Sequence, residues 1–297
     1  EMNINKLPLE AQNWENTHLR YTHGYGAVVT PAAQDAAEPI IWYLRDLNMS
    51  STMGFSVKYS DIYYGQEQYK YAIVPNKLDV KELAGSDPSL GEGYKGNAGV
   101  PIPSYFRKAL LAFHFKDEKI FFSNNISKQS KVLLRRNIIE RINTITPFLH
   151  LDRDPYLVIT KDRFYWVQDA YTLSNTYPVS KPAAHDYLDG THQFNYIRNS
   201  VKITVDAYSG QVDYYISNPS DPIINAYSRA YPGVFQDLAD MPEEIRQHLR
   251  YPRDLYHMQM KVYAKYHQTT PSLFYEQAET WQFATVNKKP VLPYFIT

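Results

Sequence analysis

Apolar residues alternate with polar ones over residues 201–206 and again over residues 212–216. This period-2 pattern is typical of strands that bury one face. The residues between the two runs read Asp-Ala-Tyr-Ser-Gly. In that turn Asp206 can accept hydrogen bonds from local amides, and Gly210 can adopt a positive φ. The pattern therefore predicts a β-hairpin.

A second hairpin is predicted from residues 156–160 and 163–168, with Lys161-Asp162 as its tight turn. It runs on into Asp169-Ala170-Tyr171, the same three residues that open the turn at 206–208. This short repeat marks either an internal duplication or a chance match. If a site exists, we expect it where these two Asp-Ala-Tyr segments meet.

Helical periodicity follows Ser104, which is a suitable N-cap. Phe106, Ala109, Leu110 and Phe113 then recur at i, i+3, i+4 and i+7, and we expect that apolar face to be buried. Comparable patterns and start signals predict four helices, over residues 104–115, 128–146, 241–250 and 253–267.

Two of these helices carry further expectations. The helix over 253–267 places Leu255, Met258, Val262 and Tyr266 on one side, and we expect that stripe to be core. The helix over 128–146 has a basic side. That side is either a solvated face or a contact surface for anionic lipid headgroups or an acidic partner. Its cations are Lys128, Lys131, Arg135, Arg136 and Arg141.

The predicted fold class is therefore α+β, with antiparallel hairpins and helices packed on them. Long loops are expected at residues 31–39, 80–103 and 174–193. The chain is read as one domain over 1–297, with two subdomains at about 1–150 and 151–297 as the alternative.

Composition narrows the function classes. Lys plus Arg and Asp plus Glu each number 31, so no net charge points to nucleic acid. Cysteine is absent, which excludes disulfides, thiolate metal sites and cysteine nucleophiles. No apolar run is long enough to span a bilayer. The chain starts at Glu1, which suggests an excised or processed fragment. The 27 tyrosines suit half-exposed sheets, interfaces and sugar-stacking surfaces alike.

Candidate chemistry is confined to a few carboxylates and one histidine. Asp152, Asp154, Asp169 and Asp206 are all expected at strand ends. If those ends converge, the carboxylates could bind Ca²⁺ or act as an acid/base pair; otherwise each closes its own turn. His23, beside Gly24, is a base, a metal ligand or a hydrogen-bonded structural residue. No phosphate-binding glycine loop, nucleophile elbow or HExxH pattern occurs, so no cofactor is predicted.

The chain carries, in order, the segments YTHGYG (21–26), GVPIPSYFRK (99–108), RRNIIERI (135–142), DRDPYLVI (152–159), YWVQDAYT (165–172), FNYIRNSVKITVDAYSG (194–210) and HLRYPRDLY (248–256). Together these segments resemble the uncharacterised protein family 0182 of bacterial membrane proteins. The resemblance covers the chain from about residue 7 to its C-terminus. It implies several transmembrane helices elsewhere in the parent protein and a location on the extracytoplasmic side for this part. It carries over no catalytic residues.

Two functional hypotheses follow. The first is a non-enzymatic extracytoplasmic domain that works by contact with the parent transmembrane region, with other envelope proteins or with copies of itself. The second is a cell-envelope domain that binds or hydrolyses glycans with tyrosine surfaces and paired carboxylates, which must lie about 5–5.5 Å apart for retention or about 6.5–9.5 Å for inversion.

Overall fold

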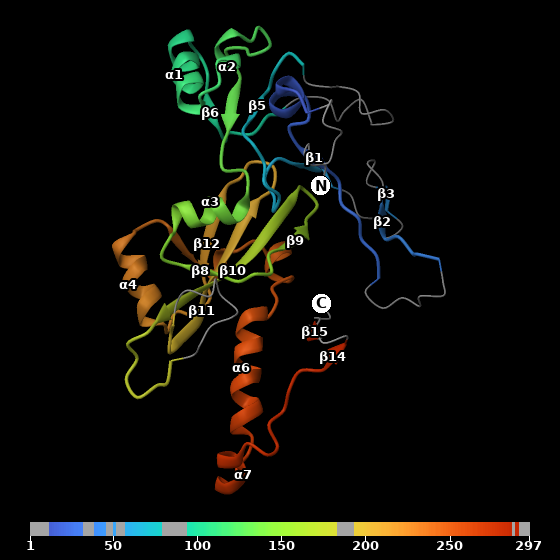
Figure 1. The fold of residues 1–297 in the computed structure, drawn as a ribbon. Helices are drawn as coiled ribbons and strands as arrows, with labels where there is room; N and C mark the ends of the chain where they lie inside the picture. The colour runs from blue at the N-terminus through green and yellow to red at the C-terminus, as the bar shows by residue number, and fades with distance from the viewer. Residues whose placement is uncertain are drawn as a thin grey trace. The chain divides into compact units, whose positions relative to one another are not determined.

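The computed structural model describes residues 12–31, 39–45, 50–51, 57–78, 94–182, 193–286 and 289–290. It contains both helices and mostly antiparallel sheets, so the α+β prediction is confirmed (Figure 1). Large parts of the three predicted loops, including the glycines at 85, 91 and 93, lie outside the described residues. Within the described residues, no helix is long and apolar enough to cross a membrane.

The chain forms two compact units that are interleaved along the sequence. Unit 1 comprises residues 1–147, 157–166 and 204–213. Unit 2 comprises residues 148–156, 167–203 and 214–297.

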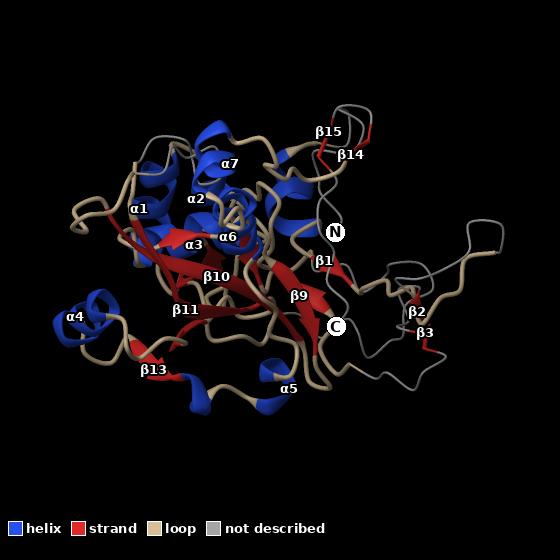
Figure 2. Ribbon diagram, turned by 90° about the horizontal axis from the view of Figure 1, so that it is seen from below, coloured by secondary structure: helices blue, strands red, loops and turns tan. Residues whose placement is uncertain are grey.

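The largest sheet has the strand order β13-β12-β11-β10-β8, with β9 also paired to β10. Figure 2 shows its two longest strands, β10 and β11, running side by side. β12 and β13 are parallel, whereas β8 and β10 are antiparallel. The bounds are β8 (His150–Leu151), β9 (Tyr156–Ile159), β10 (Phe164–Ser174), β11 (Tyr196–Asp206), β12 (Val212–Ile216) and β13 (Phe235–Asp237).

The hairpin around Asp206 is confirmed, and Gly210 has the predicted positive φ, at 70°. A Cβ at Gly210 would also lie 2.6 Å from the ring of Tyr64, so two constraints favour glycine there. The second hairpin is confirmed as well, because β9 pairs with β10, but the segment that follows it differs from its prediction. Asp169-Ala170-Tyr171 is not a turn but the middle of β10, whose residues 166–172 are all buried. A strand buried on both faces loses the alternation that marks a half-exposed one.

Unit 1 also contains a small sheet of order β5-β7-β6. Its core cluster comprises Leu19, Ile73, Ile102, Ile120 and Val132. Two helices, α1 and α2, lie side by side in this unit (Figure 1). The bounds are η3 (Asn16–Arg20), β1 (Gly24–Tyr25), β2 (Leu44–Arg45), β3 (Ser50–Ser51), β4 (Asp61–Ile62), β5 (Ala72–Val74), β6 (Val100–Pro101), α1 (Tyr105–Phe115), α2 (Lys119–Phe122), β7 (Lys131–Leu133) and α3 (Ile138–Ile145).

The helix predicted over 128–146 is wrong in its first half, where β7 stands instead and α3 begins only at Ile138. Arg136 explains the break. Its guanidinium is buried and donates to the carbonyls of Tyr63 (2.8 Å), Lys70 (3.2 Å) and Thr22. These hydrogen bonds hold the backbone at Arg136 in a non-helical conformation. The side chain of Asn137 then caps α3 by accepting from Glu140 N at 2.9 Å.

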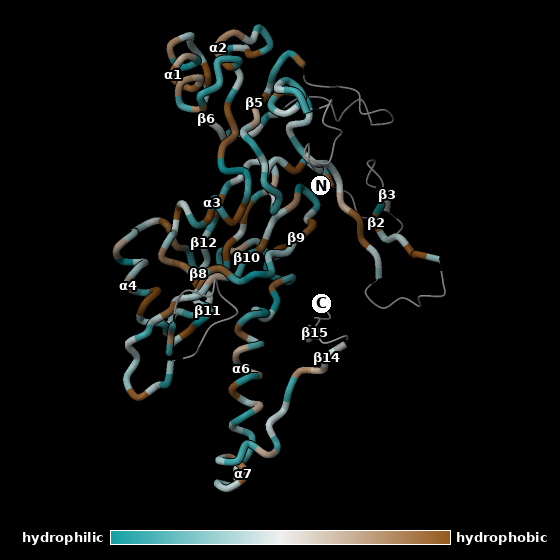
Figure 3. Tube along the Cα trace, in the orientation of Figure 1, coloured by the Kyte–Doolittle hydropathy of each residue, from teal (hydrophilic) through white to brown (hydrophobic). Residues whose placement is uncertain are grey.

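The helix predicted over 104–115 is confirmed as α1, and Ser104 Oγ accepts from Arg107 N at 3.3 Å. The prediction that its apolar face is buried is wrong. Phe106, Leu110 and Phe113 are 73%, 51% and 85% exposed. The opposite side, with Leu111, Ala112 and Phe115, packs on the core cluster. Figure 3 shows the hydrophobic stretches of α1 and α2 in brown.

Unit 2 holds the helices α4 to α7, of which α6 confirms the prediction over 253–267. The helix predicted over 241–250 is reduced to four residues. In Figure 1, α6 runs away from the strands of unit 2 and α7 follows at its far end. The bounds are α4 (Pro222–Ala230), η5 (Leu238–Asp240), α5 (Glu243–Arg246), α6 (Arg253–Tyr266), α7 (Pro271–Glu276), β14 (Thr285–Val286) and β15 (Lys289–Pro290).

Candidate functional site

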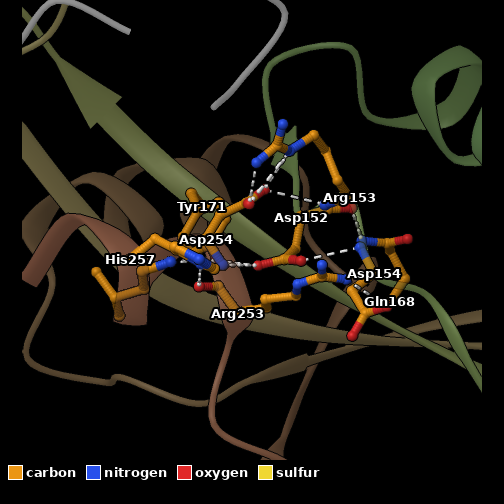
Figure 4. Close-up of polar contacts among 9 residues, drawn as sticks. Asp152, Arg153, Asp154, Gln168, Tyr171, Arg253, Asp254 and His257 are labelled. Atoms are coloured by element: carbon orange, nitrogen blue, oxygen red, sulfur yellow. Dashed lines mark hydrogen bonds and ion pairs between the residues drawn. The ribbon is translucent and has the colours of Figure 1, made fainter. Parts of the chain in front are cut away.

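Asp152, directly after β8, is the centre of a buried polar network in unit 2 (Figure 4). Its Oδ1 accepts from Asp154 N at 2.9 Å. Its Oδ2 accepts from Asp254 N at 2.9 Å and from the hydroxyl of Tyr171. Tyr171 Oη in turn accepts from Leu255 N at 3.2 Å. Both carboxylate oxygens of Asp152 are therefore engaged by protein donors.

This network caps the N-terminus of α6. The first amides of a helix have no partner within the helix. Pro252, at the N-cap position, offers no side-chain acceptor. Asp152 and Tyr171 supply acceptors for the amides of Asp254 and Leu255 from another part of the chain. A carboxylate at this end of a helix is also favoured by the helix dipole.

Asp254, in the first turn of α6, is buried and paired with Arg153. Its Oδ1 accepts from Arg153 Nη2 at 2.8 Å, and its Oδ2 accepts from Arg153 N at 3.1 Å. Arg153 thereby holds α6 against the loop after β8. Asp154 is more exposed and makes a weaker ion pair, with Arg253 Nη1 at 3.4 Å.

Asp169, in the middle of β10, forms a second buried pair, with Lys202 of β11. Asp169 Oδ1 accepts from Lys202 Nζ and from Asn199 Nδ2, the latter at 3.1 Å. Lys202 Nζ also donates to the carbonyl of Arg250 at 3.1 Å. The ion pair compensates for burying the Asp169 carboxylate in a strand that is covered on both faces.

Burial raises the pKa of Asp152 above its ordinary value, although Tyr171 donates to the carboxylate. Burial likewise raises the pKa of Asp169, against the opposing effect of Lys202. The pKa of Tyr171 is raised as well, first by burial and then by the neighbouring Asp152 charge. Shifted carboxyl groups are common in active sites, but structural networks shift them too.

Asp206 belongs to unit 1, whereas the other three predicted carboxylates belong to unit 2. Its Oδ1 accepts from Tyr208 N at 2.8 Å, and its Oδ2 accepts from Ser209 Oγ at 2.8 Å. Arg163 Nη1 donates to the same Oδ2 at 2.9 Å. Of the two alternatives, Asp206 therefore closes its own turn.

The His23 ring contacts the side chains of Thr22 and Asp61, which both belong to unit 1. Its Nδ1 is 2.9 Å from Thr22 Oγ1, and its Nε2 is 3.4 Å from Asp61 Oδ1. The ring stacks on Tyr63 with centroids 4.5 Å apart. Thr22 is buried, and Asp61 lies in β4, which pairs with β1 directly after His23. These contacts stabilise the β1–β4 pair, which favours a hydrogen-bonded structural role for His23 over a base or metal ligand.

In the described portions of the chain, no group of three or more His, Asp or Glu side chains could hold a metal ion. We therefore assign neither Ca²⁺ nor another metal to Asp152, Asp154, Asp169 or Asp206.

Three of the five basic residues on the predicted contact side are used within unit 1. Arg136 is buried against three carbonyls, Lys131 Nζ donates to the carbonyl of Gly96 at 3.0 Å, and Arg141 Nε donates to the carbonyl of Gly210 at 2.6 Å. Lys128 and Arg135 are exposed, and lipid contact by them stays a prediction.

An apolar groove of about 620 Å³ lies along α6 in unit 2. Leu255 and Met258, the first residues of the apolar stripe on α6, line this groove. Both are half-buried and pack against Tyr171 and Phe194. The same stripe leaves the core further on, where Val262 and Tyr266 are 58% and 66% exposed. The prediction that the whole stripe is core is therefore correct only for its first half. Ser180, Lys181 and Asn195 give the groove a polar margin.

The model of the uncharacterised protein family UPF0182 matches residues 1–297, the whole chain. The chain belongs to this family. A UPF0182 protein of Methylococcus capsulatus is 54% identical over all of the chain, which covers 34% of that protein. UPF0182 proteins of Syntrophobacter fumaroxidans and Nitrosococcus oceani are 45% and 46% identical over all of the chain, with 34% and 35% of each covered.

The chain thus spans about a third of the length of these UPF0182 relatives. No solved structure matches it. The family resemblance drawn from the ordered segments is confirmed.

Sequence reasoning missed Asp221 and Asp254 as key carboxylates of this UPF0182 chain. Asp221 accepts from the hydroxyls of Thr172 (2.5 Å), Ser200 (2.6 Å) and Tyr196 (2.8 Å), and also caps α4 through Ile223 N at 3.1 Å. The signal was available, because Asp followed by Pro is a common helix start. For Asp254, Pro252 two residues before it gave a similar but weaker signal.

Proposed function

We propose that this chain is a non-enzymatic, extracytoplasmic part of a bacterial membrane protein and that it acts by contact with other proteins or with copies of itself. The membrane and extracytoplasmic location is supported by the family resemblance. The chain's share of its relatives, about a third, leaves room for other parts.

The observation that carries the contact function is the groove along α6. Its floor is apolar and includes Phe194 and Met258. Its lining also includes the exposed side chains of Val262, Tyr263 and Tyr266, together with polar residues. Protein interfaces have this composition, with aromatic residues and Met enriched at the centre and polar residues at the rim. An apolar segment of a protein, helical or extended, is the occupant that this chemistry favours.

The alternative of a glycan-hydrolysing domain is less well supported. It requires two carboxylates available to substrate beside an aromatic surface. Asp152 is fully engaged by amides and Tyr171, and Asp169 is buried against Lys202. The contact function needs no such carboxylates.

Site-specific photocrosslinking tests this proposal in the longer protein, expressed in its own bacterium. A benzophenone amino acid replaces Val262 in the groove, and a matched control replaces Ala226, an exposed residue of α4. We expect a discrete crosslinked product at position 262, identified by mass spectrometry as a second copy or another envelope protein. Tyr266→Glu should reduce its yield roughly tenfold or more, because it places a charge in an apolar groove.

The mass of the product separates self-association from a different partner. Equal crosslinking from positions 262 and 226, or a product indifferent to Tyr266→Glu, would contradict the proposal.

A further inference from the structure

Five large apolar side chains point outward from α1 and α2 in unit 1, and we refer to them as the α1–α2 face. All are more than half exposed. Soluble proteins expose single apolar residues freely, but five large ones on two adjoining helices indicate an interaction surface. The residues are Tyr105, Phe106, Leu110, Phe113 and Phe122.

The helix is fixed in this orientation by its other side. Phe115 and Ile120 lie in or against the core cluster of unit 1. Lys108 Nζ donates to the carbonyl of Ser123 at 2.6 Å, which ties α1 to the end of α2. A rotation of α1 that hid Phe106 and Phe113 would expose these groups. The outward stripe therefore belongs to the folded unit.

Cations border this face. Lys116 and Lys119 line the same shallow hollow as Phe113 and Phe121, and Arg107 is exposed on α1.

The acid between these lysines, Asp117, is half-buried, lines the same hollow and is hydrogen-bonded to two side chains of unit 1. Asp117 Oδ2 accepts from Trp14 Nε1 and from the hydroxyl of Tyr71, both at 2.6 Å. Burial opposes ionisation, but those two hydrogen bonds hold the pKa of Asp117 below its ordinary value. Asp117 and Glu118, which both line the hollow, are therefore the two acids beside the three exposed cations Arg107, Lys116 and Lys119.

We propose that the α1–α2 face docks on the surface of a bilayer that contains anionic lipid. The phenyl rings of Phe106, Phe113 and Phe122 enter the boundary between headgroups and acyl chains. Lys116 and Lys119 lay their stems along the apolar surface and reach the lipid phosphates. Exposed lysines beside a phenylalanine stripe suit an anionic lipid surface, because the rings can enter its apolar boundary while the ammonium groups meet its phosphates.

This inference goes beyond the proposed function, which rests on the α6 groove of the other unit, so either can fail alone. The test is co-sedimentation of the full chain with vesicles of phosphatidylcholine, or of equimolar phosphatidylcholine and phosphatidylglycerol. We expect binding to the anionic vesicles that weakens with added salt. Phe106→Ser with Phe113→Ser should weaken it roughly tenfold per ring removed. The matched control is Tyr275→Ser, an equally exposed aromatic residue of α7, which should bind as the parent chain does.

A labelled chain locates the contact. Since the protein has no cysteine, Ala109→Cys carries a single environment-sensitive fluorophore on α1, and Ala226→Cys carries it on α4 as a control. Anionic vesicles should raise the emission at position 109 only.

The proposal is overturned if the chain binds neither kind of vesicle, or if the serine pair binds as tightly as the parent chain. It is also overturned if the Phe residues instead mediate a dimer in solution that the serine pair abolishes. Circular dichroism confirms that each variant is folded.

Discussion

The polar interior of unit 2 and the α1–α2 face of unit 1 reverse the usual roles of their residue types. In unit 2, the carboxylates that could act in catalysis are buried and accept hydrogen bonds from amides, hydroxyls and cationic side chains. They are Asp152, Asp169, Asp221 and Asp254. In unit 1, a phenylalanine stripe that could fill a core faces outward instead.

Stability and contact therefore reside in different regions of this chain. A buried carboxylate persists when each of its oxygens is hydrogen-bonded, and it then becomes costly to remove. An exposed apolar stripe contributes little to folding and is available for a partner. Substitutions in the two regions should therefore affect different measurements.

The largest loss of stability is expected for Asp152→Ala. It removes the acceptor of Asp154 N, Asp254 N and the Tyr171 hydroxyl, and leaves those buried donors unpaired. The free energy of unfolding should fall by about 2–4 kcal/mol, measured by urea denaturation.

Asp154→Ala is the matched control for that variant, because its carboxylate is partly exposed and makes one long ion pair. Its loss should stay below about 1 kcal/mol. Equal losses for the two variants would show that the network around Asp152 does not secure α6.

A smaller, pH-dependent loss is expected for Asp221→Asn. Burial opposes ionisation of Asp221, but the hydroxyls of Ser200, Thr172 and Tyr196 hold its pKa below the ordinary value of 3.8. A lowered pKa means that the carboxylate stabilises the fold above its unfolded pKa. That stabilisation is lost as the pH falls through the folded pKa.

The variant should therefore be less stable than the parent chain by about 1–3 kcal/mol near neutral pH. The gap should narrow only below about pH 4, in urea titrations of both chains at several pH values. A gap that is constant from neutral to strongly acidic pH would mean that the ionised form of Asp221 is not what the hydroxyls stabilise.

The hairpins were accessible from sequence because alternation reports one buried face and the Asp206–Gly210 turn has its own local chemistry. The position of Asp169 inside a strand could not be predicted from sequence, because it depends on an ion pair with Lys202, which lies 33 residues further along the chain. An Asp whose charge is neutralised by a residue distant in sequence looks like a turn residue when only its sequence neighbours are considered.

The α1 helix shows a different limit. Periodicity identified the helix and its apolar stripe, but it cannot tell which side of a helix the rest of the chain covers. The opposite side was chosen by Phe115 and Lys108, whose partners lie in the core cluster and at Ser123. The helix expected over 128–146 failed for a related reason, since the carbonyls that hold Arg136 come from residues 22, 63 and 70.

The comparison between the two regions rests most directly on one measurement, urea unfolding of Phe106→Ser/Phe113→Ser beside Asp152→Ala. Phe and Ser have similar helix propensities, and both rings are largely exposed. The serine pair should therefore change the free energy of unfolding by no more than about 0.5 kcal/mol. A loss as large as that of Asp152→Ala would mean that the α1–α2 face is part of the core of unit 1, and the account would be wrong.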